Sequence, residues 1–186
     1  MKEYTGDKIR NVAIVGHGGA GTTSLTEALL YRSGSISRMC KVEDGQTTTD
    51  FEPEEIKRGV SVSATLAPVE WRDVKINFID TPGFADFVAE VKGAFRAVDS
   101  VLIVVSATSG VQIGTEQCWK LAEEAGLPRL IFVNKMDREN ADYDNILNVN
   151  DAAEIFFLAQ GQFQDRQGST APGTAPGQGR KFLRRH

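Results

Sequence analysis

The chain has 186 residues, enough for one domain with a hydrophobic core. Its composition, 41% hydrophobic and 25% charged, is typical of a soluble globular protein. Residues 1–149 hold 16 basic and 22 acidic residues, a net charge of −6, so we expect no face that binds DNA directly. The apolar run at 101–105 is too short to cross a bilayer, so no membrane association is expected.

The cysteines and the N-terminus indicate a compartment. Cys40 and Cys118 are far apart and match no metal or redox spacing, which favours a reducing environment. The apolar run before Gly16 is shorter than the core of a signal peptide. We therefore predict a cytoplasmic protein. Separately, we expect a monomer.

Short β-branched runs and helix-like leucine spacing alternate along the chain. The elements expected first are a buried strand at 11–15, a helix from Thr23 to Gly34, a long loop at 35–59, and strands at 60–71 and 74–80. The elements expected next are a helix at 86–97, a strand at 101–107, a helix at 115–126 capped by Thr115, a strand at 129–135 and a short helix at 141–149. This alternation predicts an α/β fold with a mostly parallel sheet and helices on both faces. Ligands of such folds bind at the carboxyl ends of the strands.

The composition changes near residue 150. Residues 168–179 contain four glycines and two prolines, and the tetrapeptide TAPG is repeated in tandem. Such a segment cannot bury a core, so disorder is expected. We divide the chain into a partial nucleotide-binding domain at 1–149 and a low-complexity tail at 150–186.

The sequence GHGGAGTT, residues 16–23, has the outline of a phosphate-binding loop between a strand and a helix. Glycines permit the tight backbone that points N–H groups at phosphate oxygens, and the helix start adds its positive end. The candidate phosphate-binding residues are Gly16, His17, Gly18, Gly19, Ala20, Gly21, Thr22, Thr23 and Ser24. For this loop alone, a glycine-rich turn that binds nothing remains the alternative.

Two further motifs follow predicted strands. DTPGF supplies a carboxylate suited to supporting Mg²⁺ and a glycine N–H suited to a γ-phosphate. NKMD supplies a carboxylate that can accept two N–H bonds from the edge of guanine. The candidate residues in these motifs are Asp80, Thr81, Pro82, Gly83, Phe84, Asn134, Lys135, Met136 and Asp137.

Together with KRGVSVS, these motifs resemble the G domain of translational GTPases, in particular the elongation factor G family in its bacterial elongation-factor-G-like variant. The resemblance covers roughly residues 8–149. It implies the P-loop NTPase fold, GTP or GDP and Mg²⁺ as ligands, and the ribosome as partner. It also implies that Thr23 and Ser61 ligate Mg²⁺ and that Asp80 supports the ion. By the same resemblance, Gly83 contacts the γ-phosphate and the NKMD residues hold guanine.

The chain departs from the family at three places. Thr22 replaces the lysine that contacts the β- and γ-phosphates, and Phe84 occupies the position of the usual histidine, so no catalytic residue is assigned. The family's next strand, which bears a Ser-Ala motif, and its closing helix are not recognisable after residue 149, as expected of a truncated or frame-shifted domain. Two interpretations stay open. One is a Mg²⁺-dependent GTPase domain of a translation factor; the other is a non-catalytic remnant that binds GTP or GDP weakly or not at all.

Overall fold

The computed structural model describes residues 2–141. Five strands form one sheet in the order β2-β3-β1-β4-β5. The strands are β1 (Ile9–Gly16), β2 (Thr65–Trp71), β3 (Val74–Asp80), β4 (Ser100–Ser106) and β5 (Arg129–Asn134). Strands β3, β1, β4 and β5 run parallel, and β2 pairs antiparallel with β3. The predicted mostly parallel sheet is confirmed.

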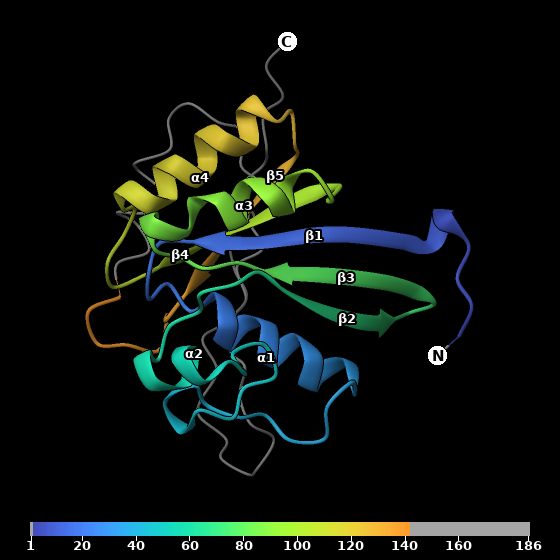
Figure 1. Ribbon diagram of the computed structural model, residues 1–186, viewed down its shortest axis with the longest axis horizontal. Coiled ribbons are helices and arrows are strands. Elements are labelled where there is room, and N and C mark those ends of the chain that lie inside the picture. The colour runs from blue at the N-terminus through green and yellow to red at the C-terminus, as the bar shows by residue number, and fades with distance from the viewer. Residues whose placement is uncertain (1, 142–186) are drawn as a thin grey trace, which may run out of the picture.

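Helices cover both faces of this sheet, as Figure 1 shows. The α-helices are α1 (Thr22–Ser33), α2 (Pro53–Arg58), α3 (Val88–Phe95) and α4 (Ile113–Glu124). Three 3₁₀ turns lie at Gly6–Lys8, Val42–Asp44 and Ala85–Phe87. Helices α3 and α4 lie on one face, and α1 packs on the other with α2 beside it (Figure 1).

Two apolar clusters fill the space between the sheet and its helices. One joins β1, β4 and β5 to α3 and α4, and Ile103 and Ala122 at its centre are fully buried. The other joins β1, β2 and β3 to α1, with Ile14 and Leu30 among its members. β1 and β4 contribute to both clusters, and their residues 12–15 and 101–105 are continuously apolar, as expected of strands covered on both faces.

The parallel register brings the carboxyl ends of the strands to one edge of the sheet. Ile14 of β1 pairs with Asp80 at the end of β3, and Ser106 of β4 pairs with Asn134 at the end of β5. Gly16 ends β1 beside Val104. All three sequence motifs therefore begin at the same edge.

The prediction of an uninterrupted loop over 35–59 is wrong, because α2 lies within it. Pro53 occupies the first turn of α2, where its missing N–H costs nothing. Glu52 and Glu55 form a capping box, and Gly59 ends the helix in the left-handed conformation. The helix has only six residues, too short for an apolar period to reveal it.

The predicted strand at 60–71 begins only at Thr65. Before it, carboxylates take up the backbone N–H groups that a partner strand would otherwise engage. Glu55 Oε1 accepts hydrogen bonds from Val62 and Ser63, and Glu90 Oε2 accepts one from Ala64. These side-chain acceptors hold the segment out of the sheet.

Two helix boundaries also differ from the prediction. The helix expected at 115–126 is α4, which begins two residues earlier, and Gln112 rather than Thr115 is its N-cap. Thr115 instead completes the capping box, with its hydroxyl 3.4 Å from the Gln112 nitrogen. The helix expected at 86–97 is divided into a 3₁₀ turn and α3.

The predicted short helix at 141–149 falls, apart from its first residue, outside the described residues, and so does the tail at 150–186. Within residues 2–141, no helix is long and apolar enough to cross a membrane.

Candidate functional site

The glycine-rich loop joins the end of β1 to the start of α1. Gly19 and Gly21 adopt positive φ angles of 81° and 95°, which favour glycine, and Ala20 donates its N–H to the His17 carbonyl at 3.0 Å. Gly21 is the N-cap of α1 and provides no side-chain cap. The first N–H groups of α1 therefore face the loop without an intrahelical acceptor, and such an end attracts anions.

The residues that follow β5 brace this loop from the other side. Asn134 Nδ2 donates to the Ala20 carbonyl at 2.9 Å, and Lys135 Nζ donates to the Gly19 carbonyl at 2.7 Å. The contact with Asn134 is so close that a Cβ at Gly21 would lie 2.4 Å from Nδ2. The first and third motifs are thus in direct contact, although 114 residues separate Asn134 from Ala20.

The second motif lies against the same loop. Thr81 donates to the Ile14 carbonyl through both its backbone N–H, at 3.1 Å, and its hydroxyl, at 2.9 Å. A Cβ at Gly83 would lie 2.8 Å from the His17 carbonyl group and 2.9 Å from the Gly18 nitrogen. Only glycine allows this turn to approach the loop so closely.

We expect Gly83→Ala to destabilise the fold by about 1–3 kcal/mol, since backbone atoms on the opposite side cannot move away cheaply. The added methyl group should also push the turn off the loop and weaken binding of a GTP analogue more than binding of GDP. Urea denaturation and nucleotide titration measure the two effects. Gly93→Ala in α3 is the control, because nothing lies within 4 Å of its added Cβ and the helix should gain stability. Equal stability of both variants would contradict the prediction.

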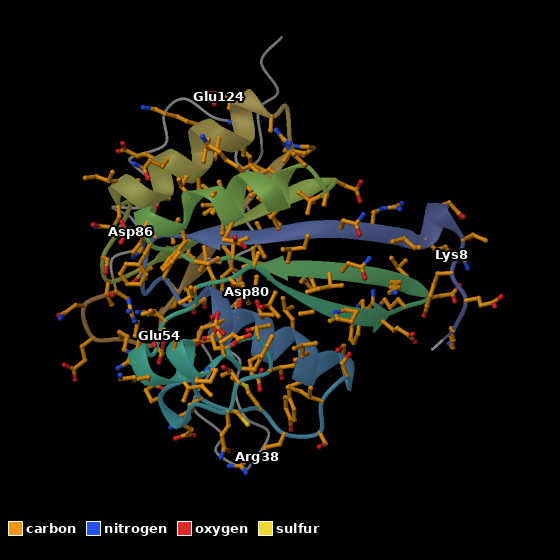
Figure 2. All side chains as sticks on the ribbon, viewed as in Figure 1. Lys8, Arg38, Glu54, Asp80, Asp86 and Glu124 are labelled. Atoms are coloured by element: carbon orange, nitrogen blue, oxygen red, sulfur yellow. The ribbon has the colours of Figure 1, made fainter. Side chains whose placement is uncertain are left out.

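Beside the start of α1, hydroxyl groups surround two buried carboxylates. Thr23 Oγ1 lies 3.0 Å from Ser61 Oγ, and Ser61 Oγ donates to Asp50 Oδ1 at 2.6 Å. Thr49 Oγ1 donates to Asp80 Oδ2 at 3.0 Å. Figure 2 shows Asp80 in the interior, near the carboxyl end of β3 and α1. The three residues predicted to hold Mg²⁺, Thr23, Ser61 and Asp80, are thus gathered in one cluster.

This cluster fits a hard cation. Asp50 Oδ2 and Asp80 Oδ1 are buried without a hydrogen-bond partner, and the two residues are 5% and 2% exposed. Burial raises the pKa of Asp80 to about 7, while the hydroxyls of Thr49, Thr23 and Thr22 act in the opposite direction. Burial is also the main cause of the raised pKa of Asp50. Mg²⁺ prefers oxygen ligands such as carboxylates, and these two oxygens are not occupied by hydrogen-bond donors.

The cluster holds two carboxylates, with hydroxyls as its other oxygen donors. No group of three or more His, Cys, Asp or Glu side chains within residues 2–141 is arranged to hold a metal ion. A cation here would complete its shell with water or with phosphate oxygens, as Mg²⁺ commonly does.

An open hollow of about 750 Å³ lies beyond the third motif. It is lined by Thr108, Lys135, Asp137, Arg138, Glu139 and Asn140. Asp137 and Met136 are exposed to solvent. The carboxylate predicted to accept the guanine edge is therefore accessible to a ligand.

Phe84 and His17 lie on the opposite side of the loop. The Phe84 ring packs on Gly18, where an added Cβ would lie 3.0 Å from the ring, yet Phe84 remains 46% exposed. Burial lowers the pKa of His17, and the Lys135 charge adds to this effect. His17 Nδ1 lies 3.4 Å from the Thr115 hydroxyl. Among residues 2–141, His17 is the only histidine, and its lowered pKa favours the neutral ring.

Two further buried carboxylates order the segment between α1 and β2. Glu27 accepts hydrogen bonds from the N–H groups of Cys40 and Thr48, at 3.2 and 2.9 Å. Glu55 accepts from Val62 at 2.9 Å and, as described, from Ser63. Both glutamates are 1% exposed. They fix the backbone on either side of Asp50 and Ser61, and so position the oxygen cluster.

We expect Glu55→Gln to loosen this segment, because the NH₂ group that replaces one of the two oxygens cannot accept a hydrogen bond from the backbone donor it faces. The cost is about 1–3 kcal/mol. Faster hydrogen exchange at the Glu52 amide, or at the Val62 and Ser63 amides, measures the loosening, since the NH₂ group must face one of these two sides. Glu54→Gln is the matched control, since Glu54 is exposed and pairs only with Arg58 on the surface. Unchanged exchange in Glu55→Gln would show that the carboxylate is not the anchor.

The sequence prediction did not include Asp50, Thr49, Glu27 or Glu55 in the site. Thr49 and Asp50 stand in the run TTTD, whose hydroxyl-carboxylate composition resembles the rest of the cluster. Glu27 lies at a position of α1 that faces the protein interior, where an unpaired carboxylate is unusual. The glutamate among the leucines of this helix was therefore the feature of the sequence that could have indicated a buried carboxylate near the site.

Comparison with known proteins gives consistent similarities. The family model described as Elongation factor Tu GTP binding domain matches residues 7–178. Elongation factor G 2 of Borreliella burgdorferi is 43% identical over 139 residues, which are 75% of this chain and 21% of that protein. Ribosome-releasing factor 2, mitochondrial, of Yarrowia lipolytica is 42% identical over 139 residues, 75% of this chain and 17% of that protein.

Solved structures show the same similarity. A crystal structure from Thermus thermophilus superposes with a TM-score of 0.74 at 46% identity, over 77% of this chain and 22% of that one. Translation elongation factor SelB of Methanococcus maripaludis, solved with the GTP analogue GppNHp, matches with a TM-score of 0.55 over 75% of this chain and 24% of that one. At 22% identity, that match shows the fold alone. The chain spans about a fifth of the length of the curated relatives it matches.

Proposed function

The chain belongs to the family of elongation factor Tu GTP-binding domains and has an elongation-factor-G-like G domain, and on this premise we propose that its loop edge binds GTP and GDP. In the proposal, the phosphates lie on residues 16–24, the γ-phosphate meets residues 80–84, and guanine lies against residues 134–137. The fold is the P-loop NTPase fold expected from the sequence, with its mostly parallel sheet.

One observation carries the proposal. The second and third motifs come from two different strand ends and both contact the glycine-rich loop, through the Gly83 approach and the Asn134 and Lys135 hydrogen bonds. A glycine-rich turn that binds no ligand would not require an exposed carboxylate at Asp137. It would also not require the buried oxygens of Asp50 and Asp80 that lack hydrogen-bond partners. The alternative left open for the loop alone is therefore disfavoured.

Each part of the edge has a role in this proposal. The open N-terminus of α1 and the loop N–H groups hold the phosphates. Asp137 accepts hydrogen bonds from the guanine edge, and Lys135 and Asn134 keep the loop in place for it. Mg²⁺ would be held by Thr23 and Ser61 with support from Asp80, and would neutralise phosphate charge when bound.

Hydrolysis is expected to be slow. Phe84 cannot donate or accept a proton, and Thr22 provides no positive charge for the transferring phosphoryl group. A GTPase coupled to ribosomal translocation is the activity that the elongation factor G relatives suggest. A domain that binds nucleotide with little or no turnover is the second candidate, and the Thr22 and Phe84 side chains favour it. The ribosome as partner, a cytoplasmic location and a monomeric state belong to the first candidate.

The test is a titration of the full chain with fluorescent GTP analogue and GDP, in Mg²⁺, with ATP as competitor. We expect saturable binding of both guanine nucleotides and no displacement by ATP. Phosphate release, measured with and without ribosomes, then separates the two candidates. Absence of guanine-nucleotide binding in a folded chain would refute the proposal.

A further inference from the structure

Two segments leave the sheet at the same point, where β2 begins and β3 ends. Thr65, the first residue of β2, pairs with Asp80, the last residue of β3. Ser61, which belongs to the oxygen cluster, lies shortly before Thr65, and Gly83, which approaches the glycine-rich loop, lies shortly after Asp80. The segment that carries Ser61 and the turn that carries Gly83 therefore start from one place in the fold.

Glu90 of α3 joins these two segments a second time. Its Oε2 accepts the backbone N–H of Ala64 at 3.0 Å, across 26 positions of the chain. Together with the pairing of Thr65 and Asp80, this hydrogen bond fixes both ends of residues 80–90 to two adjacent residues. Hydrogen bonds to a carboxylate are among the stronger ones in proteins. The turn that follows β3 and the segment that precedes β2 should therefore move together.

The Glu90 contact links parts of the fold that belong to different faces of the sheet. Helix α3 packs on one face with α4, and the segment before β2 follows α2, which lies beside α1 on the other face (Figure 1). Val91 and Phe95, on the same helix as Glu90, are buried in the core and anchor α3 there. The Glu90 side chain therefore has a firm base from which it holds Ala64.

We propose that Glu90 is a positioning residue, which couples the turn proposed to meet the γ-phosphate to the segment that carries Ser61. The proposal rests on the proposed function, because GTP and GDP differ at that turn. A γ-phosphate that draws residues 80–84 toward the loop draws α3 with them, and the Glu90 bond then holds Ala64 and the nearby Ser61 in place. Without a γ-phosphate, the same bond is made less often. Glu90 should therefore increase the preference of the chain for GTP over GDP, as coupling between two sites requires.

Two substitutions separate the reach of this side chain from its charge. Glu90→Asp keeps a negative charge in the first turn of α3, where it suits the helix dipole, but the shorter side chain cannot reach Ala64. Glu90→Gln loses the charge, yet its amide oxygen can accept the same N–H. Fluorescent GTP analogue and GDP are titrated against the full chain of each variant in Mg²⁺, and hydrogen exchange is followed at the Ala64 amide. Circular dichroism confirms that each variant is folded.

We expect Glu90→Asp to weaken binding of GTP analogue about five- to tenfold, at the low end of coupling between two sites, and to leave GDP binding within about twofold. Without nucleotide, the Ala64 amide should exchange roughly tenfold faster in Glu90→Asp, because one hydrogen bond to a charged group is lost. In the unmodified chain, GTP analogue should slow this exchange more than GDP does, and Glu90→Asp should lose that difference. Glu90→Gln should resemble the unmodified chain in both measurements. A side chain that only stabilised the fold would not change the ratio of the two affinities.

Glu124→Asp and Glu124→Gln are the matched controls for the same changes of length and charge. Glu124 is exposed at the end of α4 and lies away from Asp80 in Figure 2. Both controls should leave the two affinities and the exchange of the Ala64 amide unchanged.

The outcomes separate this proposal from the proposed function. Equal losses of GTP analogue and GDP binding in Glu90→Asp would overturn the coupling and leave guanine-nucleotide binding intact. The same conclusion would follow if Glu90→Gln behaved like Glu90→Asp, or if exchange of the Ala64 amide were unchanged in Glu90→Asp. A folded, unmodified chain that binds neither nucleotide would refute the proposed function, and the coupling with it.

Discussion

Asp137→Ala is expected to weaken binding of GTP analogue and GDP by a hundredfold or more. The carboxylate can accept two N–H bonds from guanine, and each hydrogen bond to a charged group contributes on the order of 1.5–3 kcal/mol. At about 1.4 kcal/mol per tenfold, losing both removes at least two orders of magnitude. Asp137 is exposed at the wall of the hollow, so the loss should be one of binding and not of folding.

Fluorescence titration measures this loss, and ATP serves as the comparison ligand. The failure of ATP to displace bound guanine nucleotide should be unchanged, because adenine does not present the same pair of donors. Glu124→Ala at the end of α4 removes an equal charge from an exposed position remote from the hollow, and should have no effect. If Asp137→Ala retained full guanine affinity, residues 134–137 would not be the base site.

Thr22→Lys is expected to tighten binding of GTP analogue ten- to a hundredfold. The ammonium group would add a charge-assisted contact to the β- and γ-phosphates, on the order of 1.5–3 kcal/mol. The backbone around it is already arranged for phosphate, with Gly19 and Gly21 at positive φ and α1 beginning at residue 22. Since Thr22 is only 8% exposed, the lysine must extend into the loop to reach the nucleotide.

Ser37→Lys is the control for added charge, because Ser37 is exposed beyond the far end of α1. It should leave affinity within about twofold, as expected of a screened surface charge. Equal affinities of Thr22→Lys and the unmodified chain would show that the loop does not engage phosphates. Restored hydrolysis in Thr22→Lys would further show that Phe84 does not prevent turnover, and would assign the slow step to position 22.

The parallel core of the fold and the order of its motifs could be predicted from local sequence. Strands β1, β4 and β5 are short apolar runs bounded by glycine or polar residues, and their periodicity does not depend on distant partners. Helix α1 carries its own signals, with leucines on one face and Gly34 in the left-handed conformation at its end. A helix or strand could be predicted from local sequence wherever its own residues provided both the hydrophobic pattern and the residue that ends it.

The segment from residue 35 to residue 64 could not be predicted in the same way. Helix α2 is too short to show a hydrophobic period. The start of β2 depends on which acceptors bind the backbone N–H groups of Val62, Ser63 and Ala64. Those acceptors belong to Glu55 and to Glu90 of α3, which lies 26 residues beyond its partner Ala64. A contact across such a distance leaves no trace in local periodicity.

The sequence by itself predicts the class of ligand, because the GHGGAGTT, DTPGF and NKMD motifs each suit one part of a guanine nucleotide by their residue types alone. It also showed that Thr22 stands where a cation is usual. Only the tertiary structure placed Asp50 beside Asp80 and left one oxygen of each without a partner. The physical reason is that burial and hydrogen-bond satisfaction are properties of the folded chain, decided by what surrounds an atom and not by its neighbours in sequence.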